Sequence, residues 1–596
     1  MAPTVAPAPA GLRGGEWLLQ PSDPAAIFTP ERTTEEHRLI AQTVSDFVNN
    51  EVLTVLDQLE TKDWALARRL VQRCGELGFL GADVPETYGG VELDKVTSMI
   101  VSERISRSAS FGAAFGAQAN LTILPLVLFG TEAQKRKYLP KLLTGETIGA
   151  YCLSEPGSGS DALGARTRAT SQPDGSFVLN GEKTWITNGG FADLYIVFAK
   201  VDGEHFSAFI VERAFAGVSS GKEEHKMGLH GSSTTPVILQ DVKVPAENLL
   251  GEVGKGHKIA FNVLNFARFK LGAMCGGGAQ GAIGEAAKYA GTRKQFGQPI
   301  ASFGAIKHKL GEMVARAYAV ESLIYRTGGM IDARIEAAPA GSDKTQVALA
   351  TLEEYAIEAS IAKVAGSEML DFVLDENIQI HGGNGFVHDY PAERHYRDSR
   401  VNRIFEGTNE INRLLIPGML ARRAAKGEPP VIAAAKALQE ELLGPPQMAV
   451  QDDAPLADER RAVDAFKKAA LMVFGVALQT HGQKLADQQE VLMHLADMFI
   501  DVYSAESAVL RAMAVSSRPN GSLHSDAART FVNDAGMRLE ASAKSALAAM
   551  AEGDTLRTLL AALRRLFKMT PINTAALRRR IADETVARGA YPFQAG

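Results

Sequence analysis

The periodicity of apolar residues changes twice along the chain. Over residues 34–150, apolar positions recur every three or four residues, which predicts helices. The first helix follows the capping-type sequence Thr33-Thr34-Glu35-Glu36 and carries four apolar residues on one face: Ile40, Val44, Phe47 and Val48. After Ala150 the pattern changes to short β-branched and aromatic runs between glycine, asparagine and aspartate. That pattern is typical of antiparallel strands in a small sandwich or barrel.

Helical periodicity returns near His257 and continues to about Lys426. Its clearest stripe consists of Ile306, Leu310, Met313, Ala317, Val320 and Ile324. A segment rich in proline and acidic residues follows, and a last helical region carries Leu492, Leu495, Phe499 and Val502 on one face. We therefore expect an N-terminal tail (1–33), a helical domain (34–150), a β domain (151–256), a second helical domain (257–442), a linker (443–456) and a C-terminal helical domain (457–596).

Length and composition bound the class of protein. A chain of 596 residues is too long for one hydrophobic core, and three or four domains are expected. Its 46% hydrophobic and 22% charged residues are the proportions of a soluble globular protein. A net charge of −6 argues against a nucleic-acid-binding protein, which would be basic. The three cysteines (Cys74, Cys152 and Cys275) are widely spaced, so they suggest neither a disulfide framework nor a metal site.

The first fifteen residues, MAPTVAPAPAGLRGG, are rich in alanine and proline and are typical of a disordered tail. They lack the basic and apolar regions of a secretory signal and make a poor organellar transit peptide. No run in the sequence approaches the roughly 18 consecutive apolar residues of a membrane span. We therefore expect a cytoplasmic protein.

A loop and a tryptophan in the β region suggest a cofactor site. The loop of YCLSEPGSGSD (151–161) contains Gly157, Ser158, Gly159 and Ser160, which offer backbone N–H groups and hydroxyls. Trp185 and Thr187 follow in WITNGG and add a flat aromatic surface and a donor. Together these groups suit the isoalloxazine ring of a flavin. An ordinary Gly/Ser turn with a core tryptophan is the alternative.

One carboxylate stands out in RIFEGTNEI (403–411). Glu406 lies between the bulky apolar Phe405 and Gly407. A carboxylate against apolar surface has its pKa raised by desolvation, as a general base at neutral pH requires. A solvated loop glutamate is the alternative.

Gly276, Gly278 and Gly281 match the dinucleotide fingerprint G-x-G-x-x-G. No strand pattern precedes them and no βαβ unit surrounds them, so we do not predict a Rossmann fold. Close packing of a helix against a neighbour is the expected role of these small residues.

Five motifs, taken together, resemble those of the acyl-CoA dehydrogenase family: YCLSEPGSGSD, KTWITNG, TRKQFG, QIHGGNGF and RIFEGTNEI. They occur in the family's order between about Thr34 and Ala425. The extra C-terminal helices make the chain most similar to the very-long-chain branch and its bacterial relatives. The resemblance implies a mostly α fold with a central β domain: a helical N-terminal domain, a β-barrel-like middle domain and a four-helix bundle, with FAD between the last two.

The resemblance also implies roles for single residues. Glu406 matches the catalytic base, and the position that carries the base in some relatives is Ala267, before Arg268, so that alternative site is empty. Matches to flavin-contacting positions are Tyr151, Leu153, Ser154, Trp185 and Thr187, with Gly159 and Ser160 in the adjoining loop and Thr408 and Glu410 near the adenosine. Matches to residues that reach the FAD of a neighbouring subunit are Arg293, Gln295, Phe296, Gln379 and Gly383. A homo-oligomer, at least a dimer, follows from these.

For the substrate, the resemblance implies contacts from Ser160, Gly407 and Arg268, the last near the CoA end. Gly116 and Ala117 match the floor of the acyl pocket and would leave it open for long chains. His230 stands where many relatives carry arginine or lysine, and we assign it no role.

The function implied is FAD-dependent oxidation of long-chain acyl-CoA to trans-2-enoyl-CoA, with electrons passed to an electron-transferring flavoprotein in fatty acid β-oxidation. Two alternatives share the fold: a flavin acyl-CoA oxidase that uses oxygen, and a non-catalytic assembly or scaffold protein. The basic, leucine-rich stretch 555–569 could contact an anionic membrane. A core helix with a solvated basic face is the favoured interpretation of that stretch.

Overall fold

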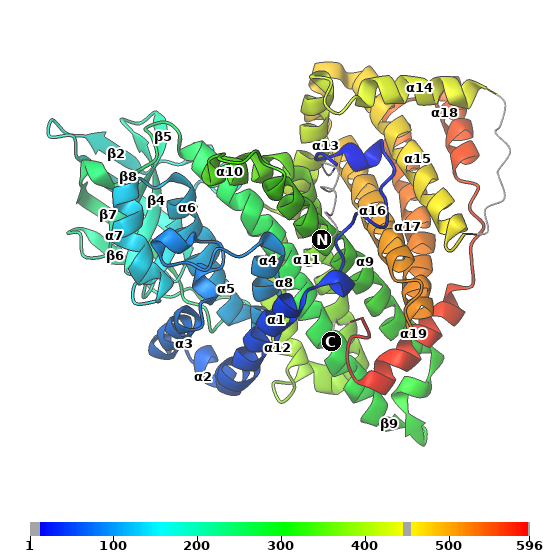
Figure 1. Cartoon of the computed structure of the whole chain (residues 1–596), viewed down its shortest axis with the longest axis horizontal. Coiled ribbons are helices and arrows are strands. Elements are labelled where there is room, and N and C mark those ends of the chain that lie inside the picture. Colours follow the sequence, from blue (N-terminus) through cyan, green and yellow to red (C-terminus); the bar gives the residue numbers. More distant parts are fainter. Residues whose placement is uncertain (1–11, 445–453, 594–596) are drawn as a thin grey trace, which may run out of the picture.

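Helical regions precede and follow a β domain along the chain in the computed structural model, which describes residues 12–444 and 454–593. The β domain lies at one end of the molecule (Figure 1). The N-terminal region contains α1 (Glu35–Phe47), α2 (Leu56–Glu60), α3 (Trp64–Glu76), α4 (Lys95–Ile105), α5 (Ala109–Gln118), α6 (Leu124–Phe129) and α7 (Glu132–Leu143). The predicted cap of α1 is present. Thr34 Oγ1 accepts from the backbone N–H of His37, and the Thr34 N–H donates to His37 Nδ1.

The helical stretch Ala109–Phe129 is long and apolar enough to cross a membrane, with a mean hydropathy of 1.5. In the folded protein 78% of its 18-residue apolar window is buried, which makes the stretch a core element of the N-terminal region.

The β domain is one sheet with the order β6-β7-β3-β2-β4-β5-β8, and β1 also pairs with β4. The four strand runs expected from the sequence form β3 (Phe177–Thr187), β4 (Leu194–Val201), β5 (His205–Glu212) and β7 (Thr234–Val244). The shorter strands are β1 (Gly149–Cys152), β2 (Arg168–Ser171), β6 (Val218–Ser220) and β8 (Leu249–Leu250).

The four runs expected from the sequence pair antiparallel, β3 with β7 and β4 with β5. The short strands β1 and β2, in contrast, both run parallel to β4. β1 pairs with the first half of β4, from Leu194 to Val197. β2 pairs with its end, at Lys200 and Val201. The glycine- and serine-rich loop between β1 and β2 leaves the sheet and returns further along β4 in the same direction, so no reversal occurs.

A long-helix bundle follows. Its helices are α8 (Gly256–Thr292), α9 (Gly304–Glu336), α10 (Lys344–Glu354), α11 (Ala356–His381), α12 (Ala392–Ser399) and α13 (Asn409–Ala425), with a small hairpin of β9 (Lys294–Gln295) and β10 (Gln298–Pro299) after α8. Because α8 is one continuous helix of 37 residues, the glycines of the G-x-G-x-x-G match lie inside a helix and not at the end of a strand.

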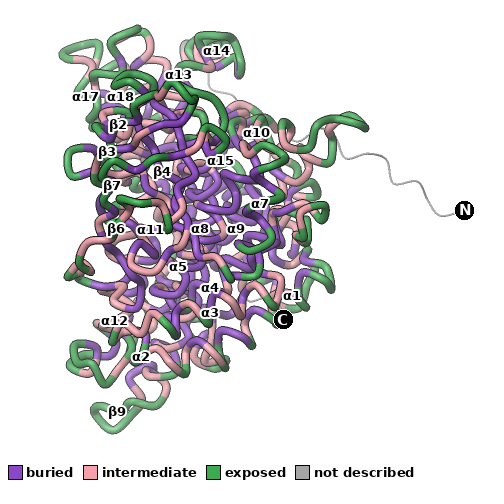
Figure 2. Tube along the Cα trace, turned by 90° about the vertical axis from the view of Figure 1, so that its left-hand side faces the viewer, coloured by how far each residue is buried: buried purple, intermediate pink, exposed green. Residues whose placement is uncertain are grey.

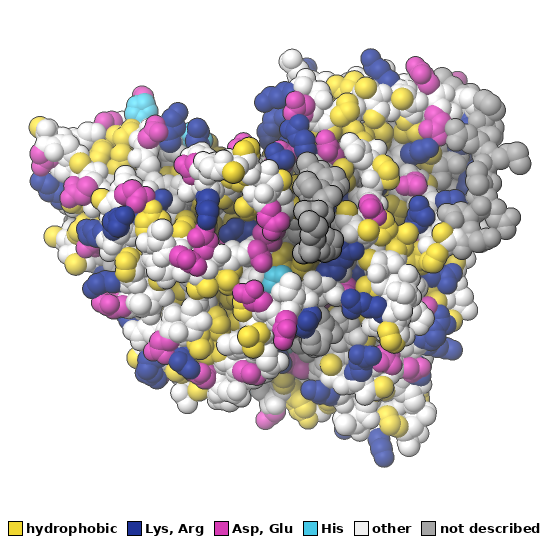
Figure 3. Space-filling model, viewed as in Figure 1, with side chains coloured by type: hydrophobic (Ala, Val, Ile, Leu, Met, Phe, Trp, Pro, Cys, Tyr) yellow, Lys and Arg dark blue, Asp and Glu magenta, His cyan; other side chains and the backbone are white. Residues whose placement is uncertain are grey.

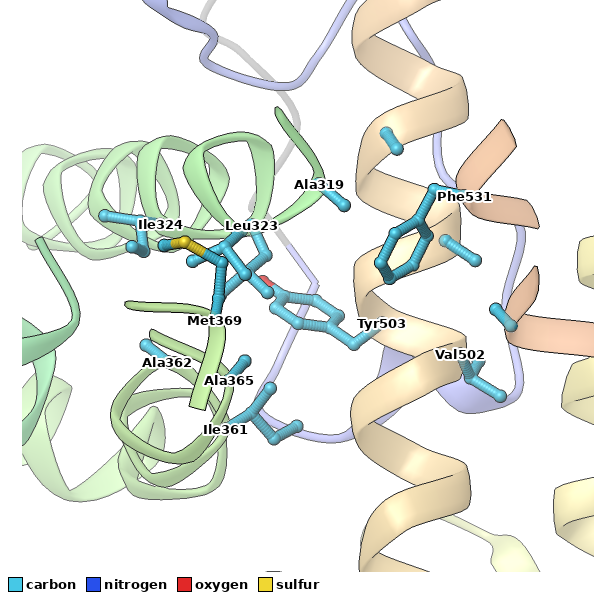
Figure 4. Packing of buried hydrophobic residues seen from close by; sticks show 14 of the residues in the cluster. Ala319, Leu323, Ile324, Ile361, Ala362, Ala365, Met369, Val502, Tyr503 and Phe531 are labelled. Carbon is cyan, nitrogen blue, oxygen red and sulfur yellow. The ribbon is translucent and has the colours of Figure 1, made fainter. Parts of the chain in front are cut away.

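The C-terminal helices pack on this bundle. They are α14 (Val431–Leu443), α15 (Ala457–His481), α16 (Gln489–Ala514), α17 (Gly521–Met550), α18 (Gly553–Leu566) and α19 (Thr574–Arg588). Figure 4 shows Tyr503 of α16 pointing toward the side chains of α9 and α11, with Val502 on the other side of α16. The Tyr503 hydroxyl also lies 3.0 Å from Thr327 Oγ1 of α9. Figure 2 shows that much of α8, α9 and α11 in the centre of the molecule is buried.

Much of the predicted N-terminal tail is part of this core. Trp17 is 1% exposed, and its indole Nε1 donates to Glu358 Oε1 of α11 at 2.8 Å. Glu31 forms an ion pair with Arg511 of α16, with Nη2 and Oε1 2.6 Å apart. The tail expected over 1–33 therefore packs on the protein from residue 12 onward, because a buried tryptophan contributes a large apolar area. Residues 1–11 lie outside the described part.

The predicted linker (443–456) falls largely on residues 445–453, outside the described part. In α18 the leucines face the protein: Leu563 is 1% exposed, and Arg565 donates through Nη2 to the Gly444 carbonyl at 3.0 Å. This is the arrangement expected of the core-helix alternative, and membrane contact stays a prediction. On the face drawn in Figure 3, basic and acidic side chains are interspersed, and the outline is notched between the β domain and the C-terminal helices.

Candidate active site

Three buried polar side chains hold the backbone at Glu406. The residue lies just before α13 in the left-handed region, with φ of +57°, and Gly407 follows with φ of +78°. Arg268 Nε of α8 donates to the Glu406 carbonyl at 3.1 Å. Lys363 of α11 and Asn412 of α13 each donate to the Gly407 carbonyl at 2.8 Å. A non-glycine residue with positive φ is strained, so these contacts keep the Glu406 side chain in one place.

The carboxylate of Glu406 is available to accept a proton. Its Oε2 is buried and has no hydrogen-bond partner among the described residues. Burial raises its pKa to about 7, against the opposing charges of Arg268 and Lys363. The backbone N–H of Glu406 also lacks a partner in the described chain. A solvated loop glutamate would have none of these features, so the geometry favours a general base.

Trp185 is turned out of the β domain. It lies on β3 at a register shift between Lys183 and Ile186, with φ of +58°, and 63% of its surface is exposed. A bulge of this kind re-aims a side chain that regular alternation would place elsewhere. The alternative of a core tryptophan is therefore wrong. Tyr151 lies on β1, and its buried hydroxyl has no partner in the described residues and lies within the electrostatic reach of Glu406.

An apolar cavity of about 210 Å³ begins beside the base, at Phe405. Its wall on α8 consists of Leu271, Met274, Gly278, Gly281, Ala282 and Glu285. A Cβ built on Gly281 meets no atom within 4 Å, so this glycine leaves open space. Gly277, in contrast, packs against α4, where a Cβ would lie 2.0 Å from the Glu103 carbonyl oxygen. Close packing was the role expected for Gly276, Gly278 and Gly281, but a Cβ built on Gly276 or Gly281 meets no atom within 4 Å, and Gly278 and Gly281 line the cavity. The close contact between helices is made by Gly277, which the fingerprint does not include.

Comparison with known proteins decides the family. Three profiles described as the N-terminal, middle and C-terminal domains of acyl-CoA dehydrogenase match residues 34–146, 150–242 and 254–420, and a second C-terminal-domain profile matches 465–565. A probable acyl-CoA dehydrogenase of Bacillus subtilis (strain 168) is 47% identical over 96% of this chain and 97% of its own length. The chain belongs to the acyl-CoA dehydrogenase family.

Two further relatives of this acyl-CoA dehydrogenase bear on its fold and branch. The crystal structure of an acyl-CoA dehydrogenase complexed with FAD from Bacillus anthracis has a TM-score of 0.95 at 49% identity, covering 98% of this chain and 100% of that one. The human mitochondrial very long-chain specific enzyme is 41% identical over 63% of this chain. The chain spans about half of that relative's length (54%).

FAD is the cofactor of this acyl-CoA dehydrogenase, and the residues at the site fit it. The exposed Trp185 and the unpartnered hydroxyl of Tyr151 supply a ring surface and a donor. A Cβ built on Gly159 meets nothing within 4 Å, so its loop can approach a ligand closely. The other positions predicted for the ring lie on the same strands or loops: Leu153, Ser154, Ser160 and Thr187.

Thr408 and Glu410 lie at the start of α13. The Thr408 hydroxyl accepts from the backbone N–H of Ile411 at 3.3 Å and so caps the helix, and Glu410 is exposed in the first turn. Thr408 thus has a local role besides any contact with adenosine.

The residues predicted to reach a neighbouring subunit do not join the site around Glu406. Arg293, Gln295, Phe296, Gln379 and Gly383 are all exposed, and Phe296 has 93% of its surface exposed. Figures 1 and 2 both place the β9 hairpin at the end of the bundle away from the β domain. This position is what contact with a second subunit requires, and the oligomeric state stays a prediction.

The floor of the acyl pocket differs from the expectation in detail. Gly116 and Ala117 are not among the cavity's lining residues, whereas Ala109 and Ala113 of the same helix, α5, are. Sequence reasoning missed the cavity lining on α8, although glycines at positions 278 and 281, three residues apart on one helix face, were a usable signal.

His230 has only local contacts among the described residues. Its Nε2 lies 2.9 Å from the Lys226 carbonyl oxygen of the same loop, and its Nδ1 lies 3.3 Å from a carboxylate oxygen of Glu60.

Proposed function

We propose that this acyl-CoA dehydrogenase oxidises long-chain acyl-CoA to trans-2-enoyl-CoA, with Glu406 as the base. The observation that carries the proposal is the unpartnered Glu406 Oε2, with its pKa raised to about 7 by burial, on the residue that follows Phe405, which lines an apolar cavity. A carboxylate with that pKa is ionised in a large share of molecules at neutral pH and strong enough to remove a proton.

In the reaction, Glu406 Oε2 accepts the proton from the α-carbon of the thioester. The electron pair left behind forms the new α,β double bond as hydride leaves the β-carbon. FAD, when bound, supplies the acceptor for that hydride. The free N–H of Glu406 is available to the thioester carbonyl, where negative charge develops, and one such donor is worth about 3 kcal/mol in comparable sites. Glu406 would thus act both as base and as a backbone donor.

The length of the cavity supports a long acyl chain. Its lining on α8 runs from Leu271 to Glu285, which is about 21 Å at the helical rise of 1.5 Å per residue. One fatty acyl chain in a membrane fills about 15 Å, half of the hydrocarbon core. Apolar side chains from α5 and α11 form the other walls: Ala109, Ala113, Leu370 and Leu374. The proposed place of the reaction is therefore fatty acid β-oxidation, in the cytoplasm.

For the electron acceptor we propose an electron-transferring flavoprotein. The caffeyl-CoA reductase–Etf complex subunit CarC of Acetobacterium woodii is 37% identical over 65% of this chain and 99% of its own length. Its name associates that relative with an Etf, and the association supports the same class of partner here.

Anaerobic titration of the flavin-loaded protein with saturated acyl-CoAs of increasing length tests the function. Loss of flavin absorbance at one equivalent of a long-chain substrate is the expected result. No bleaching with any acyl-CoA would refute the proposal. Admission of air separates it from the oxidase alternative, because rapid reoxidation without a protein acceptor would indicate an oxidase.

A further inference from the structure

Along α8, the lining of the acyl cavity ends at Glu285, which belongs to an ion pair. Glu285 of α8 and His395 of α12 both line the cavity, and His395 Nδ1 lies 3.3 Å from Glu285 Oε2. Asn377 of α11 also donates to that oxygen, at 3.3 Å. Arg107, in the turn before α5, lines the same region and acts electrostatically on Glu285. Neither Glu285 nor His395 has a role in the chemistry proposed for Glu406.

Three helices independently place this pair far from the base. On α8 the lining runs from Leu271, one turn beyond Arg268, to Glu285. On α11 it runs from Leu370 toward Asn377 and away from Lys363, which holds the Gly407 carbonyl. The third wall runs back along the chain from Phe405, next to the base, through Ser399 to His395. In Figure 1 these helices lie together in the lower middle of the molecule, where α12 also contacts α5.

The pair retains unused hydrogen-bonding capacity. Glu285 Oε1 and His395 Nε2 have no hydrogen-bond partner among the described residues, and neither atom is fully buried. The side chains keep 30% and 22% of their surfaces exposed. Although burial lowers it, the pKa of His395 is raised overall by the Glu285 carboxylate, which favours the imidazolium with a proton on Nε2. One acceptor and one donor therefore remain available on two residues that line the cavity.

We infer that the far end of the cavity selects acyl-CoA chains that carry a hydroxyl group at or near their distal carbon, bound between Glu285 and His395. This inference rests on the proposed function, because it assigns the specificity of the same site. A hydroxyl can donate to Glu285 Oε1 and accept from His395 Nε2, which satisfies both groups at once.

The alternatives fit less well. A methyl end that reaches the pair displaces water from both groups without replacing its hydrogen bonds, and such unpaired polar groups are costly. A terminal carboxylate on the acyl chain is repelled by the Glu285 carboxylate, although Arg107 and His395 attract it. A site that hydrogen-bonds a hydroxyl strongly rejects ligands that lack one. An apolar pocket, in contrast, rejects a ligand with an added hydroxyl only weakly.

The test compares saturated acyl-CoAs with ω-hydroxyacyl-CoAs of the same length on the flavin-loaded wild-type enzyme, using a dye as electron acceptor. The ratio of kcat/KM, hydroxylated over plain, is expected below 1 for chains that end among Leu271 and Met274. It should rise above 1 at the length that reaches Glu285. A ratio that stays at or below 1 at every length overturns the inference, and so does a higher kcat/KM for the ω-carboxyl chain.

Variants locate the effect. His395→Leu is expected to lower the ratio at the preferred length about tenfold, the effect of one lost hydrogen bond of this kind. His388→Leu is the matched control, because His388 also pairs with a glutamate, Glu393 at 2.8 Å, but does not line the cavity. An unchanged ratio in His395→Leu contradicts the inference. If that variant does not retain FAD, Glu285→Leu removes the partner from the opposite wall and is expected to lower the ratio equally.

The two proposals fail separately. If no acyl-CoA of any kind bleaches the flavin, the proposed function is wrong. If plain long-chain acyl-CoA bleaches it and the hydroxyl ratio never exceeds 1, only the assignment of Glu285 and His395 is wrong.

Discussion

Arg268 Nε donates a hydrogen bond to the carbonyl oxygen of Glu406 at 3.1 Å, although the two residues are 138 positions apart. Arg268 is on α8, the helix that also lines the acyl cavity from Leu271 onward. One helix therefore positions the loop that carries the proposed base and lines the cavity proposed for the acyl chain. A shift of α8 would disturb binding and proton transfer together.

Replacement of the base is expected to abolish most activity. Glu406→Gln keeps the size of the side chain and removes its basicity, so kcat should fall by about 10²- to 10⁴-fold. Stopped-flow measurement of flavin bleaching by long-chain acyl-CoA gives the rate. The same change at the exposed Glu440 of α14 is the control. A Glu406→Gln variant that bleaches at the wild-type rate would exclude Glu406 as the base.

Activity is expected to rise with pH through about 7. Burial raises the pKa of Glu406 to about 7, and only the ionised carboxylate can accept the α-proton. The value of kcat/KM should therefore fall about tenfold per pH unit well below 7 and level off above it. A profile of kcat/KM from pH 5.5 to 9 measures this. A profile flat down to pH 5.5 would mean that the carboxylate is less desolvated than the structure indicates.

The glycine after the base is expected to be needed for both conformation and space. Gly407 has φ of +78°, and a Cβ there would lie 3.2 Å from Asn412 Nδ2 and 3.4 Å from Arg268 Nη2. Gly407→Ala should lower stability by about 1 kcal/mol or more and reduce kcat by displacing Glu406. Thermal melting and turnover measure the two effects.

A matched control separates the loss of stability caused by a positive φ from the loss of turnover caused by displacing Glu406. Gly427 has nearly the same conformation, with φ of +80°, and open space around a Cβ. Gly427→Ala should lower the melting temperature while turnover stays at the wild-type value. Equal turnover in the two alanine variants would contradict the role of Gly407.

Blocking the cavity is expected to shorten the preferred acyl chain. Gly281→Leu places a side chain in the open space of the lining, so kcat/KM for long chains should drop at least tenfold, whereas short chains are less affected. Gly418 of α13 also has open space but does not line the cavity, and Gly418→Leu is the control. An unchanged chain-length profile in Gly281→Leu would show that the acyl chain does not follow α8.

The exposed hairpin is expected to hold a second subunit. Phe296 has 93% of its surface exposed at the tip of β9–β10. If a neighbouring subunit and its FAD cover it, Phe296→Asp should convert the oligomer to monomer and lower the flavin content severalfold. Light scattering after gel filtration and the flavin-to-protein absorbance ratio measure both. Leu39→Asp changes another exposed apolar residue, 67% exposed on α1, and should alter neither.

Several elements could be predicted from the sequence because local rules govern them. The stripe that includes Leu310 and Met313 is the buried face of α9, and the β-branched runs became β3, β4, β5 and β7. The parallel pairing of β1 and β2 with β4 was not predicted, because strand direction depends on the path of the connecting loop. The packed segment around Trp17 was missed because its alanine- and proline-rich surroundings give no periodicity.

The sequence by itself determined the helical and β regions, the motifs of the family and the prediction that Glu406 is a general base, since each depends on neighbours a few residues away. Tertiary structure alone decided that Gly278 and Gly281 open onto a cavity while Gly277 packs against α4. It also brought Glu285 and His395 together across 110 residues of chain. Periodicity predicts which face of a helix is buried, but what that face meets depends on the packing of every other element.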